Sequence, residues 1–161
     1  MNGSTPHWTN PANIGSPSSF ASISLAASVT SGDLDASNFG FTIPTGATIN
    51  GVVVKIDRKA SASSAIQYTG VTLSAGGTTK TPGGLWITSV VTDTIGSSSD
   101  LWGATLTPTI VNNSSFGVTI VAVNVSGGTN KTASVANGNI IIYYTPSAGG
   151  ARASASAFFN F

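Results

Sequence analysis

The chain has 161 residues, 40% of them hydrophobic, and its six Lys and Arg and five acidic residues give a net charge of +1 at pH 7. So small a charge excludes the basic surface on which nucleic-acid binding depends. The absence of Cys excludes disulfide scaffolds and thiol catalysis. Glu is also absent, and the one histidine, His7, lies in a proline-rich arm. The sequence therefore predicts a protein that is not an enzyme and uses no cofactor.

The composition favours an all-β fold. Val, Ile and Thr are frequent and suit pleated surfaces, whereas the residues that sustain helices are scarce. Abundant Ser and Gly are also typical of disordered chains, but the regular spacing of apolar residues favours an ordered domain. We expect one β-sandwich or jelly-roll-like domain over residues 21–145, preceded by an extended N-terminal arm (1–20) and followed by a C-terminal tail (146–161).

The first half of the chain begins with that arm, in which prolines are scattered among Gly, Ser and Asn. Trp8 is expected to anchor the arm on a neighbouring surface, and no signal peptide is expected. Strands are predicted at residues 22–29, 38–44 and 49–56, with a loop at 33–35 between the first two. In the second strand, alternate residues from Phe39 onward should face inward. In the third, Lys55 and Asp57 lie on the wetter face.

The second half contains the most apolar strands. They are predicted at residues 66–73, 85–92, 116–125 and 140–144. The segment 116–125 is apolar on both faces, which predicts a central strand covered on both sides. Asn137-Gly138 precedes the last of these strands and predicts a hairpin turn. No apolar run approaches the ~20 residues that a membrane-spanning helix requires.

The tail has a different composition, because Ala and Ser dominate it until Phe158, Phe159 and Phe161 close the chain. Exposed aromatic residues at this density promote aggregation, so we expect them to be docked. The sequence leaves open whether they dock on their own domain or on another subunit. Together with Trp8 they are the predicted assembly contacts of a homo-oligomer.

The remaining residues offer candidates for two kinds of ligand site, a sugar-binding site and a calcium site. Trp86, beside a glycine-rich loop, and Tyr68 are the candidates for stacking on a sugar ring, with core packing as the alternative for both. Trp102 is expected to be structural. Asp33 and Asp35 are the candidates for a weak calcium site, because hard oxygen ligands on a glycine-flanked loop suit Ca²⁺. The spacing matches no complete calcium-binding signature.

Three stretches resemble small β-rich structural proteins of tailed-bacteriophage virions. They are residues 38–52 (NFGFTIPTGATINGV), Asp100-Leu101-Trp102-Gly103 and Phe116-Gly117-Val118. The resemblance implies a virion component, either a capsid decoration protein or a protein associated with the tail or a fibre. It transfers no site residue, because these motifs shape the fold.

The sequence thus supports two functional hypotheses. The first is a non-enzymatic structural component of a virion that packs against copies of itself and against other virion proteins. The alternative is a carbohydrate-binding or adhesion module that recognises a host-surface glycan. The choice between capsid and tail, the symmetry of the oligomer and the binding of a glycan or calcium ion all stay open at this stage.

Overall fold

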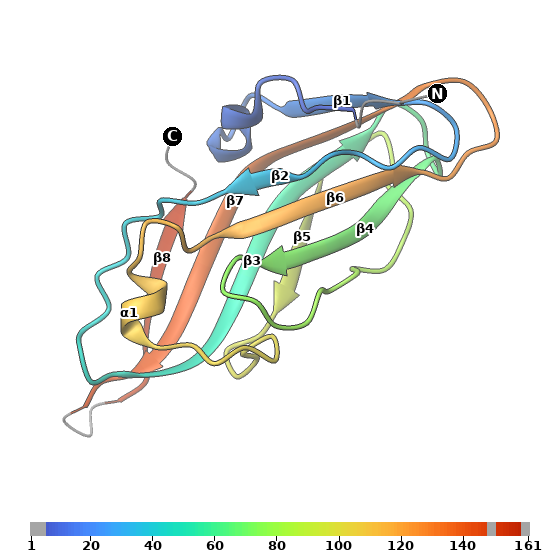
Figure 1. Cartoon of the computed structure of the whole chain (residues 1–161). Coiled ribbons are helices and arrows are strands. Elements are labelled where there is room, and N and C mark those ends of the chain that lie inside the picture. The colour runs from blue at the N-terminus through green and yellow to red at the C-terminus, as the bar shows by residue number, and fades with distance from the viewer. Residues whose placement is uncertain (1–5, 148–150, 159–161) are drawn as a thin grey trace.

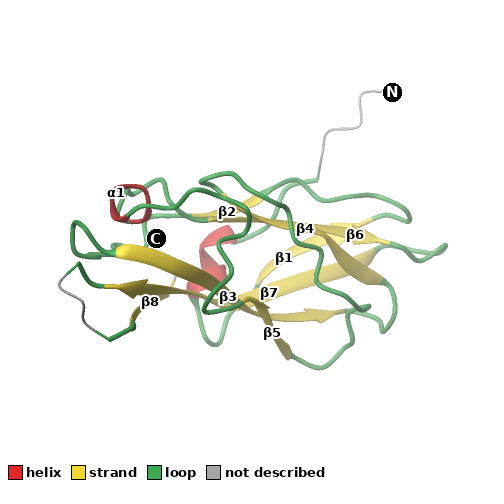
Figure 2. Ribbon diagram, turned by 90° about the horizontal axis from the view of Figure 1, so that it is seen from below, coloured by secondary structure: helices red, strands yellow, loops and turns green. Residues whose placement is uncertain are grey.

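The protein is a two-layer β-sandwich, as the composition predicts (Figure 1, Figure 2). The structure is a computed structural model that describes residues 6–147 and 151–158. A five-stranded antiparallel sheet packs against a three-stranded antiparallel sheet, with the apolar core between them. Successive strands from β1 to β7 alternate between the two sheets, which gives the jelly-roll-like connectivity. Within the described residues, no helix is both long enough and apolar enough to cross a membrane.

The larger sheet is built around two long strands. β3 (Thr48–Ala60) and β7 (Lys131–Thr145) pair along most of their length, and β5 (Val91–Gly96) pairs with the other edge of β3. The far edge of β7 is shared by two strands placed end to end. β1 (Ala21–Leu25) pairs with residues 131–135 of β7, and β8 (Ala153–Phe158) pairs with residues 139–144.

The smaller sheet has the order β2 (Leu34–Ala36), β6 (Val118–Asn124), β4 (Ile66–Leu73). The prediction that the segment 116–125 is covered on both sides is wrong. β6 is the central strand, but its residues alternate between buried and half-buried, because only one face meets the other sheet. The aspartates at 33 and 35 do not share a loop either, since Asp35 lies within β2.

Residues 38–44 show a second departure from the sequence pattern. Phe39, Phe41 and Ile43 are buried in alternation as predicted, but the segment is not a strand. Instead of a neighbouring strand, the side chain of Asn112 satisfies the backbone of Ile43. It accepts from the Ile43 N–H and donates to the Ile43 carbonyl, both at 2.8 Å. An extended segment can therefore bury alternate side chains without joining a ladder. Asn112 itself ends the short helix α1 (Pro108–Val111).

The predicted turn at Asn137-Gly138 is a bulge inside β7. The strand runs through both residues, and its register against β3 shifts between Lys55 and Asp57. Asn137 takes a φ of 48°, a left-handed conformation that Asn tolerates better than most residues. The local pattern that favours a hairpin turn is used here to insert one extra residue into β7. The bulge bends β7 and turns Asn137 toward the face of the sheet that points away from the core.

The N-terminal arm packs on its own domain. It forms a 3-10 helix, η1 (Pro11–Gly15), whose Ile14 is fully buried. Trp8 is 8% exposed and its indole N–H donates to the Gly32 carbonyl at 3.0 Å. Thr9 and Ser22 form an isolated bridge that covers part of the outer edge of β1. The expectation that Trp8 anchors the arm on another subunit is therefore corrected, because the core of this chain holds it.

Candidate functional site

A shallow hollow lies on the outer face of the larger sheet. It has a volume of about 320 Å³, and we call it the outer groove. On this face the strands present alternate residues, because their neighbours in sequence, such as Ile140 and Ile142, are fully buried between the sheets. The groove is shallow and open, and four strands or strand ends contribute to it. Its lining residues are Lys55, Thr92, Asn137, Asn139, Ile141, Ser156 and Phe158.

Strand register brings these residues together from distant parts of the chain. Lys55 on β3 lies opposite Asn139 on β7, which in turn lies opposite Phe158 on β8. The next row along the sheet places Ile141 of β7 opposite Ser156 of β8. Side chains that are paired across antiparallel strands lie about 5 Å apart, so each row forms a continuous strip across the sheet. The groove therefore exists only because the tail pairs with β7.

Hydrogen bonds between side chains fix the polar groups at one end of the outer groove. The Asp57 carboxylate accepts from the Thr92 hydroxyl at 2.5 Å and from the Asn137 side-chain amide at 3.0 Å. Both donors are lining residues, and Asp57 holds them in place. The remaining acceptor oxygens of Thr92 and Asn137 stay available to an incoming hydroxyl or amide group. These groups need no large rearrangement to bind a polar ligand.

A second set of hydrogen bonds attaches the tail to the sheet. The Asn139 side-chain amide donates to the Ser156 hydroxyl at 2.9 Å and to the Ala157 carbonyl at 3.0 Å. Asn139 is only 6% exposed, so its cost of burial is offset by these contacts rather than by water. Ala155 and Ala157 face the core on the opposite side of β8. The strand is thus held by its backbone ladder, by Asn139 and by small apolar contacts.

Two groups at the outer groove, the Phe158 ring and the Lys55 ammonium group, face solvent. The ring of Phe158 is 56% exposed at the rim. Lys55 is exposed, and within residues 6–147 and 151–158 the ion pairs are Arg58–Asp93 and Lys80–Asp100 alone, so no described carboxylate pairs with it. An exposed aromatic ring and a free ammonium group beside fixed amide and hydroxyl groups can together bind a ligand that has apolar and polar faces.

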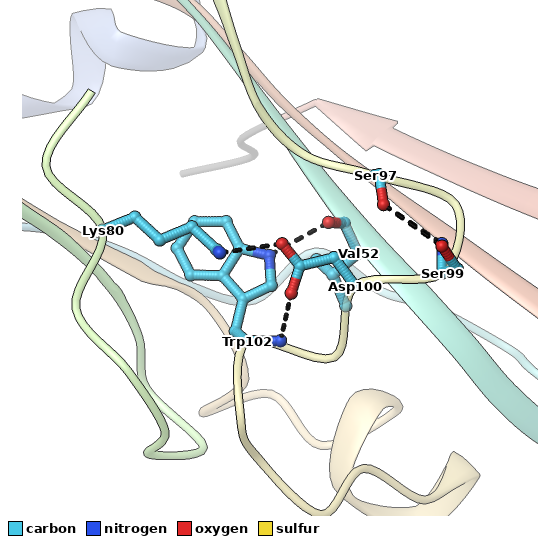
Figure 3. A network of polar contacts seen from close by, with 6 residues as sticks. All are labelled: Val52, Lys80, Ser97, Ser99, Asp100 and Trp102. Carbon is cyan, nitrogen blue, oxygen red and sulfur yellow. Dashed lines mark hydrogen bonds and ion pairs between the residues drawn. The ribbon is translucent and has the colours of Figure 1, made fainter. Parts of the chain in front are cut away.

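Further along the same face, a turn lies over β3 and limits the sheet surface. Figure 3 shows the contacts that fix it: Asp100 accepts from the Trp102 backbone N–H at 2.8 Å, and the Trp102 indole donates to the Val52 carbonyl at 3.0 Å. Lys80 forms an ion pair with Asp100 at 2.7 Å and lies 5.1 Å from the Trp102 ring centroid. The hydrogen bond from Lys80 lowers the pKa of Asp100, although partial burial opposes the shift. Trp102 is 1% exposed, which confirms its expected structural role.

The turn can approach β3 this closely because residue 51 is glycine. A Cβ on Gly51 would lie 2.4 Å from the Ser98 carbonyl carbon, a distance that no side chain tolerates. Gly51 pairs with Tyr143, whose partly exposed ring is on the same outer face as Ile141. The segment Asp100-Leu101-Trp102-Gly103 therefore has a packing role, and its contacts define where the free sheet surface ends.

The two residues proposed for sugar stacking do not reach the surface. Trp86 is 0% exposed and Tyr68 is 1% exposed, and their rings contact edge to face at a centroid distance of 4.9 Å. The expectation of an exposed stacking platform at these positions is wrong, because Trp86 lies beside the edge of β4, where its backbone N–H donates to the Ile66 carbonyl at 2.7 Å and its ring is buried. Core packing, the alternative considered for both rings, is what the structure has.

Around these rings lies a buried charged cluster. Arg58, 6% exposed, donates through two nitrogens to the Asp93 carboxylate, and its guanidinium carbon lies 5.6 Å from the Trp86 ring centroid and 5.9 Å from that of Tyr68. Burial, and then the nearby charge of Asp93, raise the pKa of Tyr68 well above its ordinary value. Arg58 Nη1, Tyr68 Oη and Trp86 Nε1 have no hydrogen-bond partner in the described part of the chain. The rings and the guanidinium group of this cluster are buried, and only Asp93 reaches solvent in part.

The remaining predicted site residues are dispersed. Asp33 and Asp35 are both exposed, and the Asp35 carboxylate accepts from the Thr119 hydroxyl at 2.5 Å. No group of three or more His, Cys, Asp or Glu that could hold a metal ion exists within the described ranges. Two aspartates without further ligands do not make the calcium site that was considered. Phe158 is at the groove rim, whereas Phe159 and Phe161 lie outside the described residues.

Sequence reasoning missed most of the outer groove. It placed Lys55 and Asp57 on the wetter face of their strand, which the structure confirms, but it had no means of pairing that strand with β7 or of pairing β7 with the tail. The sequence pattern placed Asn137 in a turn, and it gave no signal that distinguishes Asn139 from the many other Asn residues of the chain. The alternation of Ala and Ser in residues 153–157 was the signal that could have identified β8 as a strand.

Comparison with known proteins gives little further information. No family model matches the chain, and no curated protein sequence matches it. A solved structure described as "CBM4 structure and function" is similar, with a TM-score of 0.42 and 15% sequence identity over 77% of this chain and 84% of that one. A likeness this distant bears on neither ligand nor activity, so functional inference depends on the groove itself.

Proposed function

We propose that this protein is a non-catalytic binding module that recognises a glycan in the outer groove. The observation that carries the proposal is the exposed Phe158 ring beside amide and hydroxyl groups that are already fixed by hydrogen bonds. A sugar has C–H faces that pack on an aromatic ring and hydroxyl groups that bond with amides and hydroxyls. The groove supplies both kinds of contact in one open strip.

Three further features support the proposal. The groove lies on a rigid sheet, so little conformational entropy is lost on binding. Its open shape suits a chain that extends beyond the contact region at both ends. Its groups bind and position, but they include no pair of carboxylates and no nucleophile with an adjacent base.

The test compares Phe158→Ala with a matched control, Leu85→Ala. Both residues are exposed apolar side chains, but Leu85 is in the connection between β4 and β5, away from the groove. We expect the wild-type protein to bind a subset of glycans on an array and Phe158→Ala to lose at least about fivefold in affinity, since ~1 kcal/mol is typical for one aromatic contact. Leu85→Ala should bind like wild type. Equal binding by both variants would exclude the groove, and no binding by wild type would exclude the function.

A second candidate function is a structural role in an assembly, and the free edge of the larger sheet favours it. β8 is an edge strand with no charge, no proline and no glycine, so it lacks the usual features that prevent pairing with another chain. Leu85, Ile87 and Val90 are also exposed. We propose the phage virion as the setting for either function, with the module acting as a decoration, tail or fibre protein. Light scattering tests the structural role: it requires a dimer or larger assembly, and a monomer at all concentrations counts against self-assembly.

A further inference from the structure

We infer that the glycan bound in the outer groove carries a negative charge, as a carboxylate or a sulfate ester, and that Lys55 selects it; this inference rests on the proposed function. The reason lies in the position of Lys55. Lysines on edge strands commonly protect a sheet against pairing. Lys55 is instead on β3, which is flanked by β7 on one side and β5 on the other. Edge protection therefore does not explain it.

The surroundings of Lys55 leave its charge uncompensated. Its partners across the two neighbouring strands are Asn139 and Thr94, and both are neutral. In the described ranges its ammonium group has neither an ion pair nor a hydrogen bond. An ammonium group has three donors, and here all of them are available to a ligand.

Asp57 is the carboxylate to consider as a competitor. It is two residues along β3 on the same face, about 7 Å away in an extended strand. Its two oxygens already accept hydrogen bonds from Thr92 and Asn137, and it is not a lining residue of the groove. An anion would therefore bind on the other side of Lys55, toward Asn139 and Phe158, where the strip has no described acidic residue.

The chemistry of this region then defines the ligand class. One end of the strip offers the Lys55 ammonium group and the aromatic ring of Phe158, while the Ser156 hydroxyl between them already exchanges hydrogen bonds with the Asn139 side chain. A neutral sugar would displace water from the Lys55 ammonium group and offer only neutral hydroxyl acceptors in its place. A uronic acid, a sialic acid or a sulfated sugar would compensate the Lys55 charge with a charge-assisted hydrogen bond. The structure thus favours acidic over neutral glycans at this position.

The test measures wild type, Lys55→Met, Lys55→Arg and Lys131→Met on one array of acidic and neutral glycans. The best acidic glycan is then titrated by calorimetry against its carboxyl-reduced or desulfated form. Lys131→Met is the matched control, because it removes one partly exposed positive charge at the distant end of β7. We expect Lys55→Met to lose about tenfold in affinity for acidic glycans, the typical effect of one charged hydrogen bond. Lys55→Arg should keep most of that affinity, and Lys131→Met should bind like wild type.

The outcomes separate the two proposals. Wild type that binds acidic and neutralised glycans equally, with no effect of Lys55→Met, overturns the inference and leaves glycan binding in place. An equal loss in Lys55→Met and Lys131→Met shows a general effect of net charge and also overturns it. A wild-type protein that binds no glycan overturns both. Thermal unfolding of each variant confirms that the surface substitutions leave the fold intact.

Discussion

The buried ion pair between Arg58 and Asp93 gives the sharpest stability prediction. The Arg58 side chain is 7% exposed and that of Asp93 is 16% exposed, so the guanidinium has little access to water. Asp93→Asn keeps the shape of the side chain but removes the charge that compensates Arg58. Breaking a buried pair in this way costs about 3–5 kcal/mol, and the partial exposure of Asp93 places the expected value near 3 kcal/mol. That is a large share of the roughly 5–15 kcal/mol by which a domain of this size is stable.

The double variant Arg58→Met/Asp93→Leu removes both charges together. Replacing a buried pair with apolar residues is often close to neutral, so the double variant should be more stable than Asp93→Asn. It still loses the contacts of the guanidinium with the Trp86 and Tyr68 rings, each of which is worth roughly 0.5–2 kcal/mol. The coupling between the two substitutions should therefore exceed about 1 kcal/mol.

Urea unfolding of the wild type, Arg58→Met, Asp93→Leu and the double variant measures this coupling, and Asp93→Asn is unfolded beside them. With a slope of about 1–3 kcal/mol/M, Asp93→Asn should lower the midpoint by about 1–3 M. Thr94→Val is a useful control, because it changes an exposed residue next to Asp93 without touching the ion pair. An Asp93→Asn cost below about 1 kcal/mol, or strictly additive effects of the two charge removals, would refute the assignment of a buried and mutually compensating pair.

Three further predictions concern other parts of the fold. The pKa of Tyr68 is raised in the folded protein, so the unfolded chain loses the phenol proton first as pH rises. The free energy of unfolding should therefore fall as pH rises above the ordinary Tyr pKa and toward the folded pKa. The fall of the urea midpoint with pH in this range should be weaker in Tyr68→Phe. Gly51→Ala should cost about 1–3 kcal/mol, because its methyl group meets the Ser98 backbone, and an unchanged melting temperature would show that the turn can move. The pKa of Asp100 is lowered in the folded protein, so Asp100 contributes stability that is present above the unfolded pKa and is lost as pH falls through the folded pKa. Acid unfolding of Asp100→Asn should lack this pH-dependent loss of stability. An acid unfolding profile identical to that of wild type would exclude the Lys80–Asp100 ion pair in solution.

The strands with strong alternation could be predicted from the sequence because their pattern is local. β3 and β4 were located by apolar residues at every second position, and this pattern follows directly from the two-residue repeat of a strand. The same logic failed at residues 38–44, where alternation occurs without a ladder. Alternating apolar residues indicate that one face of a segment is buried. They do not indicate which group forms hydrogen bonds with its backbone, because that depends on the neighbouring part of the fold. Here that group is the side chain of Asn112.

The candidate site was harder to predict because it depends on register between distant segments. Asn137 is brought to the groove by a bulge, and the sequence signal for that bulge is identical to the signal for a turn. Trp86 was misjudged for a related reason. Its position beside a glycine-rich loop indicated a surface residue, but its indole packs inward against Tyr68 and is 0% exposed, while its neighbours Leu85 and Ile87 are exposed. Burial that depends on segments distant in the sequence cannot be predicted from a few neighbouring residues.

The central claim, that a glycan binds in the outer groove, is tested most directly by an amide chemical-shift titration. Uniformly ¹⁵N-labelled protein would be titrated with the best glycan from the array. Binding in the groove predicts shifts concentrated on Lys55, Asn137, Asn139, Ser156 and Phe158, with β2, β6 and β4 on the opposite side of the sandwich unaffected. Shifts confined to the smaller sheet, or no shifts at saturating glycan, would contradict the account.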